Sequence, residues 1–196
     1  MKKFMSIFFT GCLCAFVACN SGTTSEDSVD SAKDVNDSVM DNNDTGANTM
    51  STPVSEHDAN WAVEVANAGM TEVELSKVAK DKATSPRLKN FADMMVTEHG
   101  QANDQLKQLA ATKNITLPAN LSDASQKKLD DLNKKTAKDF DKEYTDDMLS
   151  DHKDAVDKFQ KATNDLQDPD LKSFAQQVLP KIQVHLDSIK AISGKK

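Results

Sequence analysis

Aromatic side chains are scarce in this chain. They make up 5% of its 196 residues, with a single tryptophan and a single tyrosine, and glycine occurs six times and proline five times. Domains rich in β-strands usually contain more aromatic residues, so the composition favours helices. Positive charge is also in short supply, because the formal net charge is −7. Nucleic-acid binding requires a basic face against the phosphates, so we expect no nucleic-acid partner.

Cysteine is equally rare, and all three cysteines lie within the first nineteen residues, "MKKFMSIFFTGCLCAFVAC". Two lysines precede an apolar run from Phe4 to Ala18, a pattern that predicts a signal peptide over residues 1–18. The run is short and polar chain follows it, which argues against a permanent transmembrane helix.

The end of this segment, Val17-Ala18-Cys19, resembles the lipobox of bacterial lipoproteins, with Phe16 where leucine is common. In such proteins cleavage leaves the cysteine as the first residue, which is then modified by lipid. We expect Cys19 to be that residue, with ordinary secretion and cleavage elsewhere as the alternative. The other two cysteines would leave with the signal peptide, so no disulfide framework is expected.

Residues 19–56 are dominated by serine, threonine, aspartate, asparagine and glycine, and they show no apolar period. Residues 20–56 contain eight acidic residues and only one lysine. Such a segment buries too little apolar surface to offset its ordering entropy. We therefore expect a disordered acidic tether that links a lipid anchor to a folded domain.

From about residue 57 the apolar residues recur at helical spacing. Ser85 and Asp168 are candidate N-caps, each followed by a proline at the first helical position, where proline is tolerated. The predicted helices cover approximately residues 58–83, 85–112, 122–134, 137–165 and 168–192.

A short pattern occurs twice. Pro86-x-Leu88-Lys89-x-Phe91-Ala92 recurs as Pro169-x-Leu171-Lys172-x-Phe174-Ala175, each time after a long amphipathic helix and a short turn. The simplest explanation is a duplicated helical hairpin. Two such hairpins form an antiparallel four-helix bundle over residues 57–193, with a short extra helix in the long connection between the second and third helices.

Three of the four histidines lie on the apolar stripes of three different predicted helices, as His99, His152 and His185. The stripe of the first bundle helix contains Glu72 at the corresponding place. A buried carboxylate or imidazole requires a partner, and convergence of these four side chains would satisfy all of them. The alternatives are a purely polar core network, a metal site, and histidines that do not converge.

Neutral imidazole and carboxylate are good ligands for zinc, copper, iron or nickel, and no thiolate is available in the mature domain. Glu72, His99, His152 and His185 are the candidate metal ligands, with Glu98 and Asp151 as further ligands or as acceptors that orient the rings. A di-iron site would require Glu-x-x-His on two helices, and this chain lacks those carboxylates. Phosphate-binding loops and serine-nucleophile motifs are also missing, so no catalytic residue is assigned.

The chain resembles the bacterial family called domain of unknown function 4142, catalogued as "predicted outer membrane protein" with a ferritin-like bundle. The resemblance rests on "AGMTEVELSKVAKDKATSPRLKNFADMMVTEHGQANDQLKQLA" (68–110), "FDKEYTDDMLSDHKDAVDKF" (140–159) and "DPDLKSFAQQVLPKIQVHL" (168–186). It implies an antiparallel four-helix fold outside the cytoplasm, and it supplies no activity.

The sequence therefore predicts an all-α, ferritin-like lipoprotein of the cell envelope, held at the membrane by its N-terminal lipid, most simply at the outer membrane. Its core would bind zinc, copper or iron. A second interpretation is an envelope interaction or stress module with a structural polar core. A third is an oxidoreductase with a mononuclear metal, which would need an open coordination position.

Overall fold

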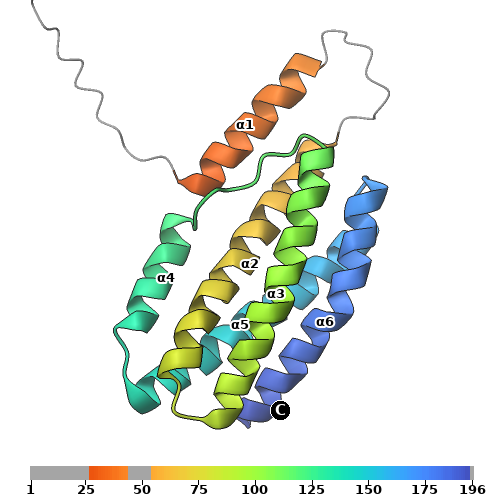
Figure 1. The fold of residues 1–196 in the computed structure, drawn as a ribbon. Coiled ribbons are helices and arrows are strands. Elements are labelled where there is room, and N and C mark those ends of the chain that lie inside the picture. The colour runs from red at the N-terminus through yellow and green to blue at the C-terminus, as the bar shows by residue number, and fades with distance from the viewer. Residues whose placement is uncertain (1–26, 44–53, 195–196) are drawn as a thin grey trace, which may run out of the picture.

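The computed structural model describes residues 27–43 and 54–194, and this part of the chain is helical without strands (Figure 1). Its helices are α1 (Ser28–Asn43), α2 (Glu56–Lys82), α3 (Pro86–Thr112), α4 (Asp123–Asn133), α5 (Ala137–Asp165) and α6 (Pro169–Ser193). The helices predicted from residue 58 onward are confirmed, each end within two residues.

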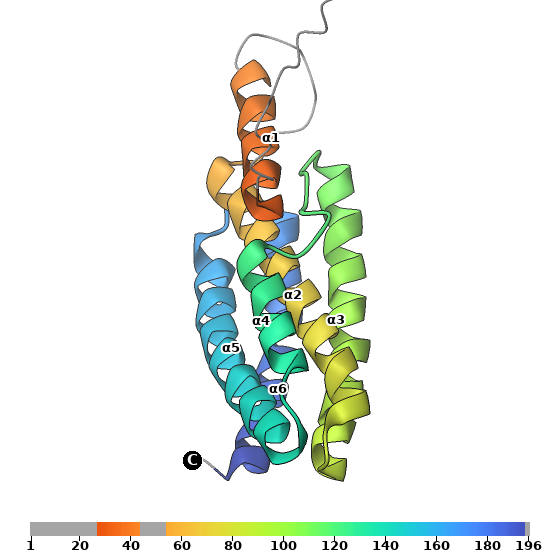
Figure 2. The same cartoon turned by 90° about the vertical axis from the view of Figure 1, so that its left-hand side faces the viewer.

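The four long helices α2, α3, α5 and α6 lie side by side (Figures 1 and 2). Short turns join α2 to α3 and α5 to α6, so each pair forms an antiparallel hairpin. The shorter α4, in the connection between the two hairpins, lies over the seam between α2 and α5 (Figure 2).

Each hairpin contributes a carboxylate that accepts hydrogen bonds from the turn of the other hairpin. The Asp58 carboxylate at the start of α2 accepts hydrogen bonds from the backbone N–H groups of Gln167 and Asp168, at 2.9 and 2.6 Å, in the α5–α6 turn. The Asp141 carboxylate on α5 accepts from the backbone N–H groups of Thr84 and Ser85, at 2.8 and 3.1 Å, in the α2–α3 turn.

Asp58 and Asp141 are 83 residues apart, as are the first residues of α3 and α6, numbers 86 and 169. The repeated sequence pattern therefore corresponds to a repeated structural contact. One offset relates α2 to α5 and α3 to α6, as expected for a duplicated hairpin with approximate twofold symmetry.

The apolar core is divided into two clusters. One surrounds Trp61, Phe159 and Phe174, whose rings meet edge to face or tilted. The other contains Phe91 and Tyr144. Along each long helix, the residues between the two clusters include one buried histidine or glutamate, so a polar layer separates the apolar halves.

Helix α1 corrects one prediction, because it lies inside the segment expected to be disordered. Apolar packing of Ala32 and Met40 and a set of polar contacts order it. The Asn36 amide donates to the Thr116 carbonyl at 3.0 Å and accepts from the Thr116 N–H at 2.7 Å, and Lys33 pairs with Glu64 on α2 at 3.0 Å. The polar Asn36 interrupts the inward face between Ala32 and Met40, so a test for apolar periodicity did not reveal this helix.

The predicted signal peptide and Cys19 lie outside the residues that the structure describes. Among the helices that it does describe, none combines the length and apolar character needed to cross a bilayer.

Candidate metal centre

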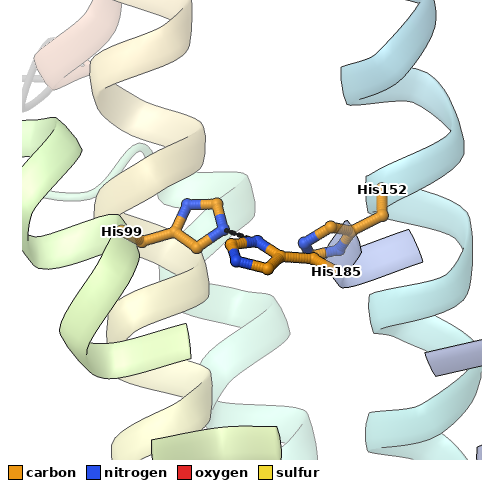
Figure 3. A group of neighbouring side chains, drawn as sticks. All are labelled: His99, His152 and His185. Carbon is orange, nitrogen blue, oxygen red and sulfur yellow. Dashed lines mark hydrogen bonds between the residues drawn. The ribbon is translucent and has the colours of Figure 1, made fainter. Parts of the chain in front are cut away.

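Three imidazole rings meet in the polar layer, one from each of α3, α5 and α6 (Figure 3). They belong to His99, His152 and His185, and a ring nitrogen of each lies within 4.8 Å of the other two. The three side chains are buried, with exposed fractions of 8%, 0% and 2%. The convergence that the helical spacing predicted is confirmed.

Two carboxylates contact the cluster from opposite sides. Glu72 on α2 is buried, and its two oxygens lie 3.0 Å from Nδ1 of His99 and 3.5 Å from Nδ1 of His152. Glu98 on α3 lies 2.8 Å from Nε2 of His185. Glu72 thus contacts one nitrogen of His99 and one of His152, and Glu98 contacts one nitrogen of His185. The other nitrogen of each ring faces away from these carboxylates.

The proton positions on His152 follow from its neighbours. Its Nδ1 lies 2.9 Å from the carbonyl oxygen of Met148, one turn earlier on α5. A carbonyl oxygen can only accept, so Nδ1 carries the hydrogen and, in the neutral ring, Nε2 has the lone pair. This Nε2 is buried and has no hydrogen-bond partner among the described residues. A buried polar atom without a partner is costly, so it needs an explanation.

The contact between the other two rings fixes a third proton. Nε2 of His185 faces the Glu98 carboxylate, which accepts its hydrogen, so Nδ1 has a lone pair in the neutral His185 ring that its lowered pKa favours. Nε2 of His99 lies 3.2 Å from that Nδ1 and must therefore donate (Figure 3). Because Nδ1 of His99 already donates to Glu72, the His99 ring carries both protons and is an imidazolium.

The electrostatics agree with this assignment. Burial opposes a charge on His99, but the neighbouring Glu72 carboxylate outweighs it and raises the pKa of His99 above its ordinary value. Burial would raise the pKa of Glu72, whereas the imidazoles, His99 first, lower it to about 2. Burial and the charge of His99 lower the pKa of His185 to about 4, and burial lowers the pKa of His152. The three rings together thus carry one proton more than three neutral imidazoles would, and this extra proton is on His99.

Asp151 lies elsewhere. Its carboxylate contacts Nζ of Lys128 on α4 at 2.6 Å, and the same ammonium lies 3.4 Å from Asp147. Among the described residues, no hydrogen bond joins Asp151 to a histidine ring. This ion-pair group attaches α4 to α5, and the sequence did not reveal it because the register of α4 against α5 cannot be derived from periodicity.

A cavity of about 280 Å³ adjoins the cluster. Glu72 and His99 form part of its wall, whereas His152 and His185 do not. The remaining wall is mostly apolar, and polar residues of α2, α4 and α5 surround the mouth. The sequence analysis missed this cavity because an unfilled volume depends on how neighbouring helices pack.

The arrangement suits a transition metal ion. Without the extra proton on His99, each ring would have a lone pair on one nitrogen, and its other nitrogen would donate to a carboxylate or to a carbonyl. Protein ligands of metals usually show this pattern, because the second hydrogen bond fixes the tautomer and the orientation of the ring. The lone pair of His152 already has no competing partner.

Comparison with known proteins gives a family and two kinds of structural neighbour. The sequence model of the family described as "Domain of unknown function (DUF4142)" matches residues 43–192. The structure described as "Crystal structure of DUF305 fragment from Deinococcus radiodurans" is similar with a TM-score of 0.63 and 11% identity, covering 73% of this chain and 99% of that one.

Two further similar structures are described as "CopM in the Cu(I)-bound form" and "CopM in the Cu(II)-bound form". Their TM-scores are 0.58 and 0.59 and their identities 18% and 16%, each covering 68% of this chain and 93% of that one. At these identities the likeness establishes a shared helical fold. Among curated proteins, no significant match is found.

Proposed function

From the premise that this chain belongs to the DUF4142 family, whose model spans residues 43–192, we propose that it binds a transition metal ion through His99, His152 and His185. The domain would be a metal-binding bundle of ferritin-like type. Metal binding, without an assigned reaction, is the function that the site supports best.

The observation that carries this proposal is the buried Nε2 of His152, which has a lone pair and no partner among the described residues. A purely structural polar network would be expected to satisfy every buried member. A metal ion at this nitrogen removes the deficit, and the two other rings lie close enough to bind the same ion.

The hydrogen bonds suggest which atoms bind. His99 and His152 would bind through Nε2, and His185 through Nδ1, because their other nitrogens donate to Glu72, Met148 and Glu98. Glu72 then serves as an acceptor for the rings rather than as the fourth ligand suggested by its position in the sequence. Bound metal would supply Lewis acidity or redox chemistry, and the protein positions the three rings.

Copper is the first metal to test. Imidazole nitrogen suits copper, zinc and iron alike, so the ligands alone do not choose among them. The structural neighbour CopM has been solved in copper-bound forms, which gives copper priority over zinc and iron.

The test is metal analysis of the full-length chain prepared without an affinity tag. We expect about one metal ion per chain from the three-ligand site, and loss of that ion in His152→Ala. His57→Ala is the matched control, because His57 is exposed and its ring contacts Asp58 outside the cluster. Equal metal content in His152→Ala and the unmodified chain would refute the site. A metal-free chain whose stability is unchanged by copper or zinc would instead favour the structural polar core.

We also propose that Cys19 is lipid-modified and anchors the domain to the cell envelope, most simply at the outer membrane. The support is the sequence pattern Val17-Ala18-Cys19 after a short apolar run. Labelled fatty acid should enter the unmodified chain, and Cys19→Ser should release it from the membrane fraction. A Cys19→Ser chain that stays membrane-bound would contradict the anchor.

A further inference from the structure

The cavity beside the cluster has a counterpart within the repeated fold. The 83-residue offset relates Glu72 to Ala155, His99 to Ile182, His152 to Gly69 and His185 to Ala102. All four counterparts, which are Ala155, Ile182, Gly69 and Ala102, line the cavity. The cavity is therefore the place where the second copy of the polar cluster would lie.

The counterparts explain why this space is open. Three imidazoles and a carboxylate fill the interior at the cluster, whereas a glycine, two alanines and an isoleucine occupy the related positions. On every long helix the counterpart is three residues from the cluster member, a separation of about 4.5 Å along the helix axis. The cavity thus lies about one helical turn from the rings.

The walls indicate what the cavity can hold. Its floor is apolar and partly aromatic, with Leu106, Phe159, Phe174 and Val178. An engineered apolar cavity of roughly 150 Å³ in another protein admits benzene, so about 280 Å³ accommodates a larger ring system. Apolar cavities with a few convergent polar groups are typical small-molecule sites, and an empty one is unfavourable in a close-packed interior.

The inner end of the cavity presents the metal centre. His99 and Glu72 line it, whereas His152 and His185 are sealed behind other side chains, with exposed fractions of 0% and 2%. A metal ion held by three protein ligands keeps an open coordination position. Any exogenous ligand of that metal would therefore approach through the cavity.

We infer that the cavity is a ligand site for a small organic molecule with a flat apolar body and a single lone-pair donor, which binds the metal held by His99, His152 and His185. The apolar body lies against Phe159 and Phe174, and the donor atom faces the cluster. This inference rests on the proposed metal binding.

Helix α4 limits what can enter. At the mouth, Ser125 on α4 contacts Thr71 at 2.8 Å and Asn67 at 3.1 Å, both on α2. On the other side, Lys128 pairs with Asp151 on α5. Because α4 is attached on both sides, to α2 and to α5, the cavity admits a small molecule more readily than a polymer. This agrees with the enclosed volume of the cavity.

The experiment compares imidazole with 4-phenylimidazole as ligands of the full-length chain loaded with Co²⁺, whose visible absorption reports a change of ligand. Both probes offer the same donor nitrogen, and only the second has an apolar body. We expect 4-phenylimidazole to bind roughly tenfold more tightly or better, because its phenyl ring leaves water.

Cavity-filling variants locate the effect. Ala102→Leu, or Ala155→Leu should the first variant fail to fold, should remove the advantage of 4-phenylimidazole over imidazole while leaving Co²⁺ uptake unchanged. Ala111→Leu is the matched control, because Ala111 is exposed on the same helix as Ala102.

Equal affinities for the two probes in the unmodified chain would overturn the ligand site and leave metal binding intact. If 4-phenylimidazole still bound more tightly than imidazole in both Ala102→Leu and Ala155→Leu, the ligand site would likewise be overturned and metal binding would remain intact. Failure of the chain to take up Co²⁺, copper or zinc would overturn the proposed function, and the ligand site with it.

Discussion

Removal of the Asp58 carboxylate should be one of the most destabilising single changes in this domain. The side chain is fully buried, and two backbone N–H groups of the α5–α6 turn donate to it. Asp58→Ala leaves both groups without their acceptor, at about 1–3 kcal/mol each, so we expect a loss of about 2–6 kcal/mol in the free energy of unfolding.

The duplicated fold supplies an internal comparison. Asp141 makes the equivalent contacts with Thr84 and Ser85, but Asp141 is more accessible to water than Asp58. Water can replace the lost acceptor there, so Asp141→Ala should cost about 0.5–1.5 kcal/mol. The difference between the two variants isolates the effect of burial at one structural contact.

The pH dependence gives a second check. Burial would raise the pKa of Asp58, but the hydrogen bonds, Asp168 first, outweigh it and lower this pKa below 3.8. The carboxylate therefore stabilises the fold fully above pH 3.8, and this contribution is lost as the pH falls through the lowered value. The difference in the free energy of unfolding between the unmodified chain and Asp58→Ala should be constant from neutral pH to about 5 and should then become smaller in stronger acid.

Urea denaturation followed by far-ultraviolet circular dichroism measures these free energies. The reasoning is wrong if Asp58→Ala and Asp141→Ala cost the same. It is equally wrong if the difference in the free energy of unfolding between the unmodified chain and Asp58→Ala increases below pH 3.8. A carboxylate with a lowered pKa can only make this difference smaller in acid.

Three further predictions concern the metal site and α1. Metal affinity should fall as the pH falls through the raised pKa of His99, since the ion must displace the proton held there, and competition titrations at several pH values would measure this. Glu98→Gln should weaken metal binding about 10- to 100-fold, because Glu98 orients a ligand ring, whereas Glu74→Gln, which changes an exposed ion pair, should not. Asn36→Ala removes both hydrogen bonds to Thr116, so amide hydrogen exchange should speed up in α1 and stay slow in the long helices.

Periodicity was sufficient to predict the long helices and the meeting of the three histidines. A helix that buries one stripe must turn every member of that stripe inward, so His99, His152 and His185 had to face the interior. Ser85 is the N-cap residue of α3, as predicted, but its side chain makes no capping hydrogen bond, and its own backbone N–H donates to Asp141.

The partners of the rings could not be predicted in the same way. Glu98 and Asp151 each precede a histidine in the sequence, yet Glu98 contacts His185 on another helix and Asp151 contacts Lys128. Adjacent residues on a helix point in different directions, so proximity in the sequence does not indicate contact. Only the packing of α3 against α6, and of α4 against α5, determines which side chains these acids meet.

The duplication separates stability from function in this fold. The symmetric positions, Asp58 and Asp141, close the two turns through the same kind of contact. The asymmetric positions form the histidine cluster on one side and the cavity on the other, where His152 corresponds to Gly69. A symmetric interior would have produced either two polar clusters, with twice the burden of buried charge, or a continuous apolar core without a site. Divergence of the two halves at four inward positions produces a buried histidine cluster and an adjoining space together, which is the arrangement that the proposed metal centre with an exchangeable ligand requires.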